Sequence, residues 1–228
     1  MWSLDPLTHV AGPSDASAGT MGWKSPVFSS RGDRFAVVSS AGDIHLWTVA
    51  GWKELPKIVA NALWILFAPN GESILALGPK DQITEWRITT RQRIGSFKGH
   101  LFEVTAACIS PNGRLLATGS KDTTVRLWDL ASRRELAKFM VGEGVINNLA
   151  FSRDGKTIAI GSFEGMIQLW NVASGQQVAT LPGHTSYVVS LAFSPDESTL
   201  ASSGLDNTLR LWKAATWEEI ARAKLSPR

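Results

Sequence analysis

Short apolar runs separated by turn-forming residues make up most of the chain. Runs of one kind follow a turn string such as SPNGR or SRDGK, and they read RFAVVSS, SILALG, LLATGS, TIAIGS and TLASSG. Runs of a second kind read DIHLW, QITEW, TVRLW, MIQLW and TLRLW. Apolar runs of about four to eight residues bounded by Gly, Pro, Asn and Asp are typical of strands. Because no long helical periodicity interrupts them, the pattern predicts an all-β chain.

Tryptophans end the second kind of run at a nearly constant spacing. They stand at Trp47, Trp86, Trp128, Trp170 and Trp212, in steps of 39, 42, 42 and 42 residues. A fixed period of about 20–50 residues indicates a repeat architecture. Each unit has room for about four short strands. Runs such as VVSLAF and INNLAF are apolar at many positions, so we expect small sheets covered on both sides, packed face to face around an axis.

Composition narrows the class of protein. The chain is 44% hydrophobic and 19% charged, which excludes a disordered chain, and its 20 glycines exclude collagen. No apolar run reaches the ~18 residues of a membrane span, and the start, MWSLDPLTHV, lacks the basic region of a secretory signal. The single cysteine, Cys108, lies in an apolar run and cannot form a disulfide within the chain. We therefore expect a cytoplasmic protein.

One segment carries a recognisable motif. It begins at Gly99-His100 and continues through LLATGSKDTTVRLWDL, ending on Trp128-Asp129, and the opening pair recurs at Gly183-His184. This segment resembles a WD-repeat unit, and the other units align with it in register. The resemblance implies a β-propeller of four-stranded antiparallel blades, with about 40–45 residues in each blade.

The period then divides the whole chain into blades of one propeller domain, 1–228. Repeats are expected at approximately 23–56, 57–97, 98–139, 140–181 and 182–228, after a partial blade at 1–12 and an irregular linker at 13–22. The partial blade follows from Trp2, 45 residues before Trp47, and TWEEIARAKL is expected to supply the last fourth strand. The expected ring is incomplete or truncated. It could be part of a longer chain, be completed by another subunit, or close unusually with exposed edges.

The resemblance also assigns a structural role to four polar residues of the third unit. In proteins of this type the histidine hydrogen-bonds to the aspartate and to the serine, and the serine hydroxyl accepts a hydrogen bond from the tryptophan N–H. That relay maps onto His100, Asp122, Ser120 and Trp128. A catalytic Ser-His-Asp interpretation lacks an oxyanion hole or a GxSxG elbow. We therefore predict a relay that satisfies buried polar groups, not an active site.

The other units keep this relay only in part. The fifth has His184, Asp206 and Trp212, with Gly204 in the serine position, and the fourth has Ser162 without the histidine. The relay is therefore expected to be complete only in the third unit, which should be the best-ordered blade. The first two units should be the loosest.

Function in a propeller is expected on the loops that the scaffold presents. The resemblance implies one face formed by the loop leading into each first strand and the turn between the second and third strands. The candidate partner-binding residues on that face are Trp23, Lys80, Glu103, Lys121, Phe163, Tyr187 and Leu205. Several are apolar or aromatic where turns are usually polar, which favours a non-catalytic protein–protein interaction scaffold that binds a peptide or protein partner.

Other functions find less support in the sequence. A pI of about 9.2, with Lys24, Lys80 and Lys121, would fit a nucleic-acid-binding propeller, but the net charge is only +3 and is spread along the chain. An accessory regulatory domain of a larger signalling protein is a further alternative. An enzyme would need a cluster of acids and bases, and Glu103 beside Lys121 is the nearest candidate. No metal or cofactor motif is present, and the four histidines are scattered.

Overall fold

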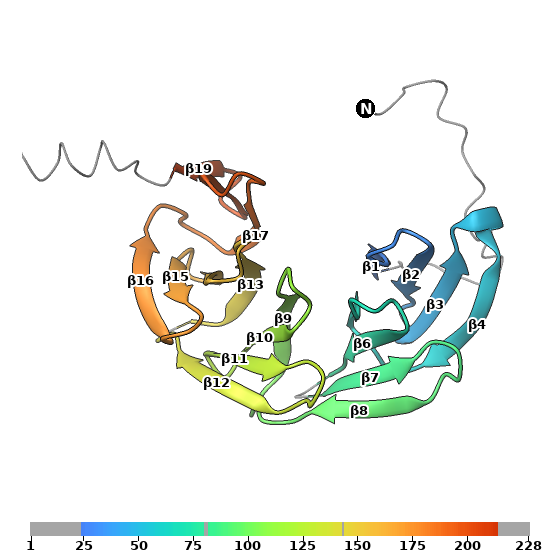
Figure 1. Cartoon of the computed structure of the whole chain (residues 1–228). Coiled ribbons are helices and arrows are strands. Elements are labelled where there is room, and N and C mark those ends of the chain that lie inside the picture. The colour runs from blue at the N-terminus through green and yellow to red at the C-terminus, as the bar shows by residue number, and fades with distance from the viewer. Residues whose placement is uncertain (1–23, 80–81, 143, 214–228) are drawn as a thin grey trace, which may run out of the picture.

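The computed structural model describes residues 24–79, 82–142 and 144–213. Over these residues, nineteen strands form five antiparallel sheets that follow one another as the blades of an arc (Figure 1). The predicted all-β propeller architecture is confirmed, and the ring is not closed between the first and last of these sheets.

The strands of each blade run from the inner edge of the arc to the outer edge in chain order. The first blade contains β1 (Lys24–Phe28), β2 (Arg34–Val38), β3 (Asp43–Thr48), the short 3-10 helix η1 (Ala50–Trp52) and β4 (Glu54–Val59). The second contains β5 (Trp64–Phe67), β6 (Ser73–Leu77), β7 (Ile83–Arg87) and β8 (Arg93–Phe97). The third contains β9 (Val104–Ile109), β10 (Leu115–Ser120), β11 (Thr124–Asp129) and β12 (Glu135–Met140). The fourth contains β13 (Ile146–Phe151), β14 (Thr157–Ser162), β15 (Ile167–Asn171) and β16 (Gln176–Leu181). The fifth contains β17 (Val188–Phe193), β18 (Thr199–Gly204) and β19 (Leu209–Lys213).

Two predicted segments fall on residues that the structure does not describe. The partial blade at 1–12 with its linker at 13–22 is one, and the last fourth strand, TWEEIARAKL, is the other. The fifth sheet is therefore described with three strands, whereas each of the first four has four.

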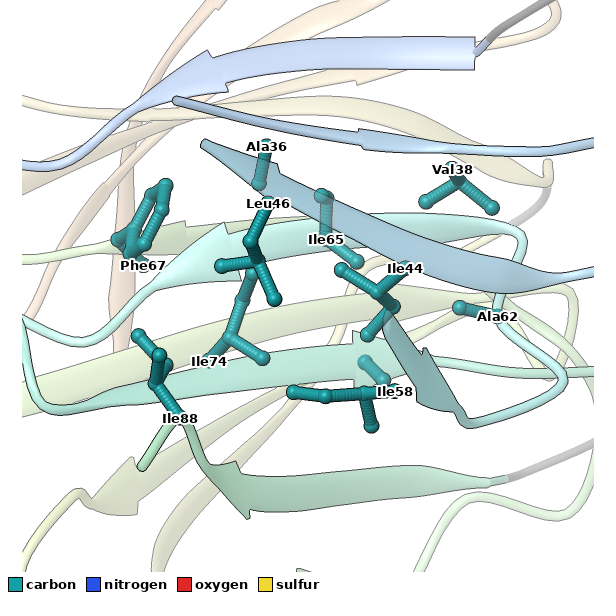
Figure 2. Close-up of a cluster of buried hydrophobic side chains, with 11 residues drawn as sticks. Ala36, Val38, Ile44, Leu46, Ile58, Ala62, Ile65, Phe67, Ile74 and Ile88 are labelled. Carbon is teal, nitrogen blue, oxygen red and sulfur yellow. The ribbon is translucent and has the colours of Figure 1, made fainter. Parts of the chain in front are cut away.

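The apolar core lies between neighbouring blades, because each sheet is apolar on both faces. One face, which we call the aliphatic face, carries the residues eleven, three and one before the repeating tryptophan. The other, the tryptophan face, carries that tryptophan and the residue twelve before it. Figure 2 shows Ala36, Ile44 and Leu46 of the first blade's aliphatic face beside Phe67 and Ile74 of the second blade's tryptophan face.

The same pairing of faces recurs along the arc. Val125 and Leu127 of the third blade pack with Leu149, Ile158 and Trp170 of the fourth. The remaining interfaces are equivalent: Leu75 and Ile83 pack with Leu116 and Trp128, and Ala159 and Ile167 pack with Leu191 and Leu200. Each blade therefore buries its aliphatic face against the tryptophan face of the next, which removes apolar surface from water on both.

Asparagine side chains join the inner strands of two blades. Asn148 in β13 donates its Nδ2 to the Val189 carbonyl of β17 at 3.0 Å, and its Oδ1 accepts from the Leu191 amide at 3.2 Å. Because β17 pairs on one edge only, with β18, these bonds satisfy backbone groups that an inner edge leaves free. Within the described ranges, no helix is both long and apolar enough to span a bilayer.

Candidate interaction face

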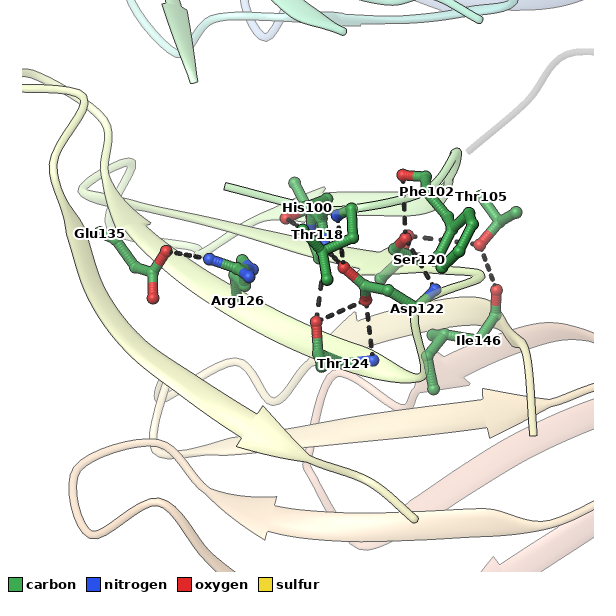
Figure 3. Close-up of polar contacts among 12 residues, drawn as sticks. His100, Phe102, Thr105, Thr118, Ser120, Asp122, Thr124, Arg126, Glu135 and Ile146 are labelled. Atoms are coloured by element: carbon green, nitrogen blue, oxygen red, sulfur yellow. Dashed lines mark hydrogen bonds and ion pairs between the residues drawn. The ribbon is translucent and has the colours of Figure 1, made fainter. Parts of the chain in front are cut away.

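A buried polar network ties the third blade together beneath its loops (Figure 3). Trp128 donates its indole N–H to the Thr118 hydroxyl at 2.8 Å, and that hydroxyl lies 2.8 Å from His100 Nε2. His100 Nδ1 lies 2.9 Å from Asp122 Oδ2, and the Thr124 hydroxyl donates to Asp122 Oδ1 at 2.6 Å. The Trp128 indole N–H, the His100 imidazole and the Thr118 and Thr124 hydroxyls therefore all have partners within the network, which avoids the cost of an unpaired polar group.

The hydroxyl of this network is Thr118, and the expectation that it is Ser120 was wrong. Strand pairing places Trp128 opposite Leu116, so the diagonal neighbour that the indole can reach is Thr118. Ser120 lies four residues beyond Leu116, about 13 Å along a strand that rises about 3.3 Å per residue. Its hydroxyl instead donates to the Phe102 carbonyl at 3.1 Å and accepts from the Asp122 amide at 3.1 Å.

The fifth blade builds the same network, contrary to the prediction that it is complete only in the third. Trp212 donates to the Ser202 hydroxyl at 2.9 Å, and that hydroxyl lies 2.8 Å from His184 Nε2. His184 Nδ1 lies 2.9 Å from Asp206 Oδ2. Gly204 does not interrupt the network. A Cβ at this glycine would lie only 2.6 Å from His184 Nδ1, so the position fits the network closely.

Blades without this network direct the tryptophan N–H elsewhere. In the second blade Trp86 donates to the Thr84 hydroxyl at 2.9 Å, and in the fourth Trp170 donates to Gln168 Oε1 at 2.8 Å. Both acceptors stand two residues before the tryptophan, on the same face of the same strand. In these two blades the indole N–H thus has an acceptor on its own strand.

Burial and hydrogen bonding set the charge states in the third blade. Burial lowers the pKa of His100 below its usual value, and the hydrogen bond to Asp122 opposes that shift only in part. Burial opposes ionisation of Asp122, but bonds from Thr124, the Leu101 amide and His100 outweigh it and lower the pKa of this carboxyl to about 2. A neutral imidazole donating from Nδ1 to an ionised carboxylate follows from both shifts.

The network has the geometry of a structural element and not of a reactive site. The Thr118 hydroxyl belongs to a fully buried residue, so no substrate can reach it, and the nearby Ser120 does not contact His100. Burial also raises the pKa of the half-buried Cys108 thiol to about 12, so the thiol stays protonated at neutral pH and is a weak nucleophile. Among residues 24–79, 82–142 and 144–213, no group of three His, Cys, Asp or Glu side chains could hold a metal ion.

Above the network, loops and turns of three blades form one side of the arc. In each blade the turn after the second strand donates a backbone N–H to the loop that leads into the first strand. These bonds join Lys121 to Glu103 at 3.0 Å, Phe163 to Val145 at 3.0 Å and Leu205 to Tyr187 at 2.9 Å. The structure therefore brings together, blade by blade, the two sets of residues that the sequence placed on one face.

Two kinds of side-chain contact divide this face. In the third blade Lys121 Nζ lies 2.7 Å from Glu103 Oε2. Between the fourth and fifth blades, the rings of Phe163 and Tyr187 stack with centroids 4.2 Å apart and planes inclined by 12°. Leu205, bonded to the Tyr187 backbone, is 59% exposed. The result is an ion pair on one blade and an aromatic platform that spans the next two.

Further apolar residues on this side were missed in the sequence. Leu101 and Phe102, directly before Glu103, are 77% and 60% exposed, and Ser120 and Asp122 hold their backbone in place. The predicted face has one residue per loop, so it does not include this apolar pair, which stands in the sequence as LF after Gly99-His100. Two predicted residues, Trp23 and Lys80, lie outside the described ranges.

Antiparallel blades in an arc, with a His–Asp–hydroxyl–Trp network under the loops, define a repeat-built β-propeller. The family model described as "WD domain, G-beta repeat" (WD40) matches residues 91–129, 135–171 and 175–213. These segments make up half of the chain, and the chain belongs to the WD40 family. The first blade and most of the second lie outside the matched segments. Comparison with curated proteins finds no match. Propellers of this family are typically used for protein–protein interaction and are generally non-catalytic.

Proposed function

We propose that the protein is a non-catalytic scaffold that binds a peptide or protein segment on the loop side of its third, fourth and fifth blades. The observation that carries the proposal is the stacked pair Phe163–Tyr187 beside the exposed Leu205. An exposed aromatic and aliphatic group on rigid loops is typical of a binding hot spot, because it offers apolar area at little entropic cost.

The rigidity of the platform supports this role. Phe163 and Leu205 are fixed by backbone bonds to neighbouring loops, and Tyr187 belongs to the loop that carries His184 of the buried network. Because the loops are already ordered in the folded protein, a partner would not have to offset the free-energy cost of ordering them on binding.

A peptide partner fits the charges better than nucleic acid does. Lys121 is already paired with Glu103, and Glu164, next to Phe163, adds an exposed carboxylate. Phosphate binding needs several cations that are free to neutralise the backbone, and it weakens steeply as salt rises. We place the scaffold in the cytoplasm, consistent with a single cysteine whose thiol is free.

The proposal is tested by selecting peptides from a random displayed library against the 228-residue protein and measuring their affinity for variants. The double variant Phe163→Ala, Tyr187→Ala should weaken binding at least about tenfold, since hot-spot residues contribute about 2 kcal/mol or more. Leu136→Ala, Val178→Ala is the matched control, because both side chains are exposed on outer strands away from the loops.

Two results would contradict the proposal. One is undiminished peptide binding by the aromatic double variant. The other is an equal loss in the control, or a loss of thermal stability large enough to account for the binding defect. The alternative function, nucleic-acid binding, is tested by measuring the affinity of the wild type for a nucleic-acid ligand at increasing salt. Binding that weakens steeply as salt rises would favour this alternative.

A further inference from the structure

The last described blade exposes two leucines of its aliphatic face. Leu209 stands three positions before its tryptophan and is 72% exposed, and Leu211, one position before, is 61% exposed. At the first of these positions, the other four blades have apolar residues that are at most 1% exposed: Ile44, Ile83, Val125 and Ile167. Strand pairing puts Leu211 opposite Ala201 and Leu209 opposite Ser203, so both leucines lie on the aliphatic face.

The first described blade exposes part of the opposite kind of face. Phe28 in β1 is 57% exposed, and its ring centroid lies 5.0 Å from that of the half-buried Phe35. Trp52 also contacts Phe35, with centroids 5.9 Å apart, and is 38% exposed. Phe35 stands twelve positions before Trp47. The residues at that position in the other blades are at most 4% exposed: Ile74, Leu116, Ile158 and Leu200.

The four interfaces between neighbouring blades show what an aliphatic face and a tryptophan face pack against. In each of them an aliphatic face packs on a tryptophan face, as Figure 2 shows for the first two blades. The two faces left exposed are one of each kind, at the two ends of the arc in Figure 1. Two exposed aliphatic faces or two exposed tryptophan faces would have no counterpart among these interfaces.

We infer that these two faces are the halves of one docking surface and that the partner is a second copy of this chain, bound head to tail. The aliphatic face of one copy, with Leu209 and Leu211, packs on the tryptophan face of the other, with Phe28 and Phe35. Such a contact is heterologous, so two copies form either a closed ring or the start of a longer assembly. This surface is separate from the loop side proposed to bind a peptide.

The test measures the mass of the 228-residue protein by light scattering after gel filtration, over a dilution series. The wild type should give a multiple of the chain mass that falls on dilution. The aliphatic-face variant Leu209→Glu, Leu211→Glu and the tryptophan-face variant Phe28→Glu should each be monomeric, because a carboxylate in an apolar interface is left unpaired.

Mixing the two variants gives the sharpest result. Each variant retains the half of the surface that the other has lost, so the mixture should form a one-to-one complex from two monomeric proteins. The control variant, Leu136→Glu with Val178→Glu, carries the same change on exposed outer strands and should assemble like the wild type. Circular dichroism verifies that each variant is folded, and Leu211→Gln replaces the double variant if that one loses its sheet signal.

Three results would overturn the inference. A wild-type protein that is monomeric at every concentration has no such surface. A face variant that still assembles alone shows a contact between like faces. Two monomeric, folded variants that do not combine show that the contact is not head to tail.

Discussion

A single hydroxyl in the second strand of a blade decides where its tryptophan donates the indole N–H. The hydroxyls of Thr118 and Ser202 accept this hydrogen bond and also contact a histidine, so their blades build the full network. The equivalent residues of the second and fourth blades are Ala76 and Ile160, whose side chains have no acceptor. There the indole donates its hydrogen bond to a side chain on the tryptophan's own strand. The network is therefore set residue by residue within an otherwise repeated frame.

The residue-scale prediction compares Thr118 and Ser120, two hydroxyl residues that stand two positions apart in β10. Thr118→Val keeps the shape but leaves Trp128 Nε1 and His100 Nε2 buried without this partner, and should lower the free energy of unfolding by about 2–4 kcal/mol. Ser120→Ala leaves Trp128 and His100 paired, removes the bonds to the Phe102 carbonyl and from the Asp122 amide, and should cost about 1–2 kcal/mol. Urea denaturation of both variants measures the difference. Equal losses would show that Thr118 does not hold the network.

The motif predicts three members of the network, but the sequence does not identify the hydroxyl that joins them. His100, Asp122 and Trp128 were placed in the network by their motif, and the structure brings their side chains together. Thr118 and Ser120 point to the same face of one strand, so alternation alone cannot choose between them. The choice needs the strand pairing that sets Leu116 opposite Trp128, and pairing is a property of two strands.

At the scale of elements, the turns of one blade are fitted to the incoming loop of the next. Gly165, in the turn between β14 and β15, has a φ of 81°, and a Cβ there would lie 2.3 Å from the His184 carbonyl oxygen. Both the left-handed conformation and the close approach require glycine. The same contact brings the Phe163 turn against the Tyr187 loop, where the two rings stack.

Gly165→Ala and Gly32→Ala separate these two requirements. Gly32, in the turn between β1 and β2, also has a positive φ, of 69°, but a Cβ there would have no atom within 4 Å outside the adjoining residues. Gly32→Ala should cost about 1–2 kcal/mol through backbone strain alone, whereas overpacking adds about 1–3 kcal/mol at Gly165. Denaturation midpoints measure both costs. A Gly165→Ala variant no less stable than Gly32→Ala would show that the fourth and fifth blades do not press together there.

The elements themselves were largely predictable, but their lateral contacts were not. Turn strings and apolar runs located the second and third strands of every blade, because these carry the clearest alternation and the tryptophan period. Phe163 and Tyr187 were each selected as surface residues, yet nothing in the sequence relates the two rings. They belong to different blades, and only the packing of one sheet on the next sets their distance.

At the scale of the whole molecule, stability is distributed along the arc. Each sheet packs on its neighbours in the arc, so the free energy of folding approximates a sum of blade and interface contributions. The third blade has an interface on each side, whereas the fifth has one within the described residues. The expectation that the third blade is the best ordered remains a prediction.

Paired tryptophan variants test this distribution. Trp128 is 1% exposed and packs edge-on against Phe97 with centroids 5.8 Å apart, so Trp128→Ala should destabilise by about 3–5 kcal/mol. Because Trp128 lies between the second and third blades, hydrogen exchange should accelerate on both sides of that interface. Trp212 is half-buried on the equivalent interface between the fourth and fifth blades, so Trp212→Ala should accelerate exchange in β13–β19 and leave the second and third blades unchanged. Mass spectrometry of the exchanged peptides resolves the two patterns. A Trp128→Ala protein with a wild-type melting curve, or a change confined to its own blade, would mean that the blades are stabilised independently and not through their shared faces.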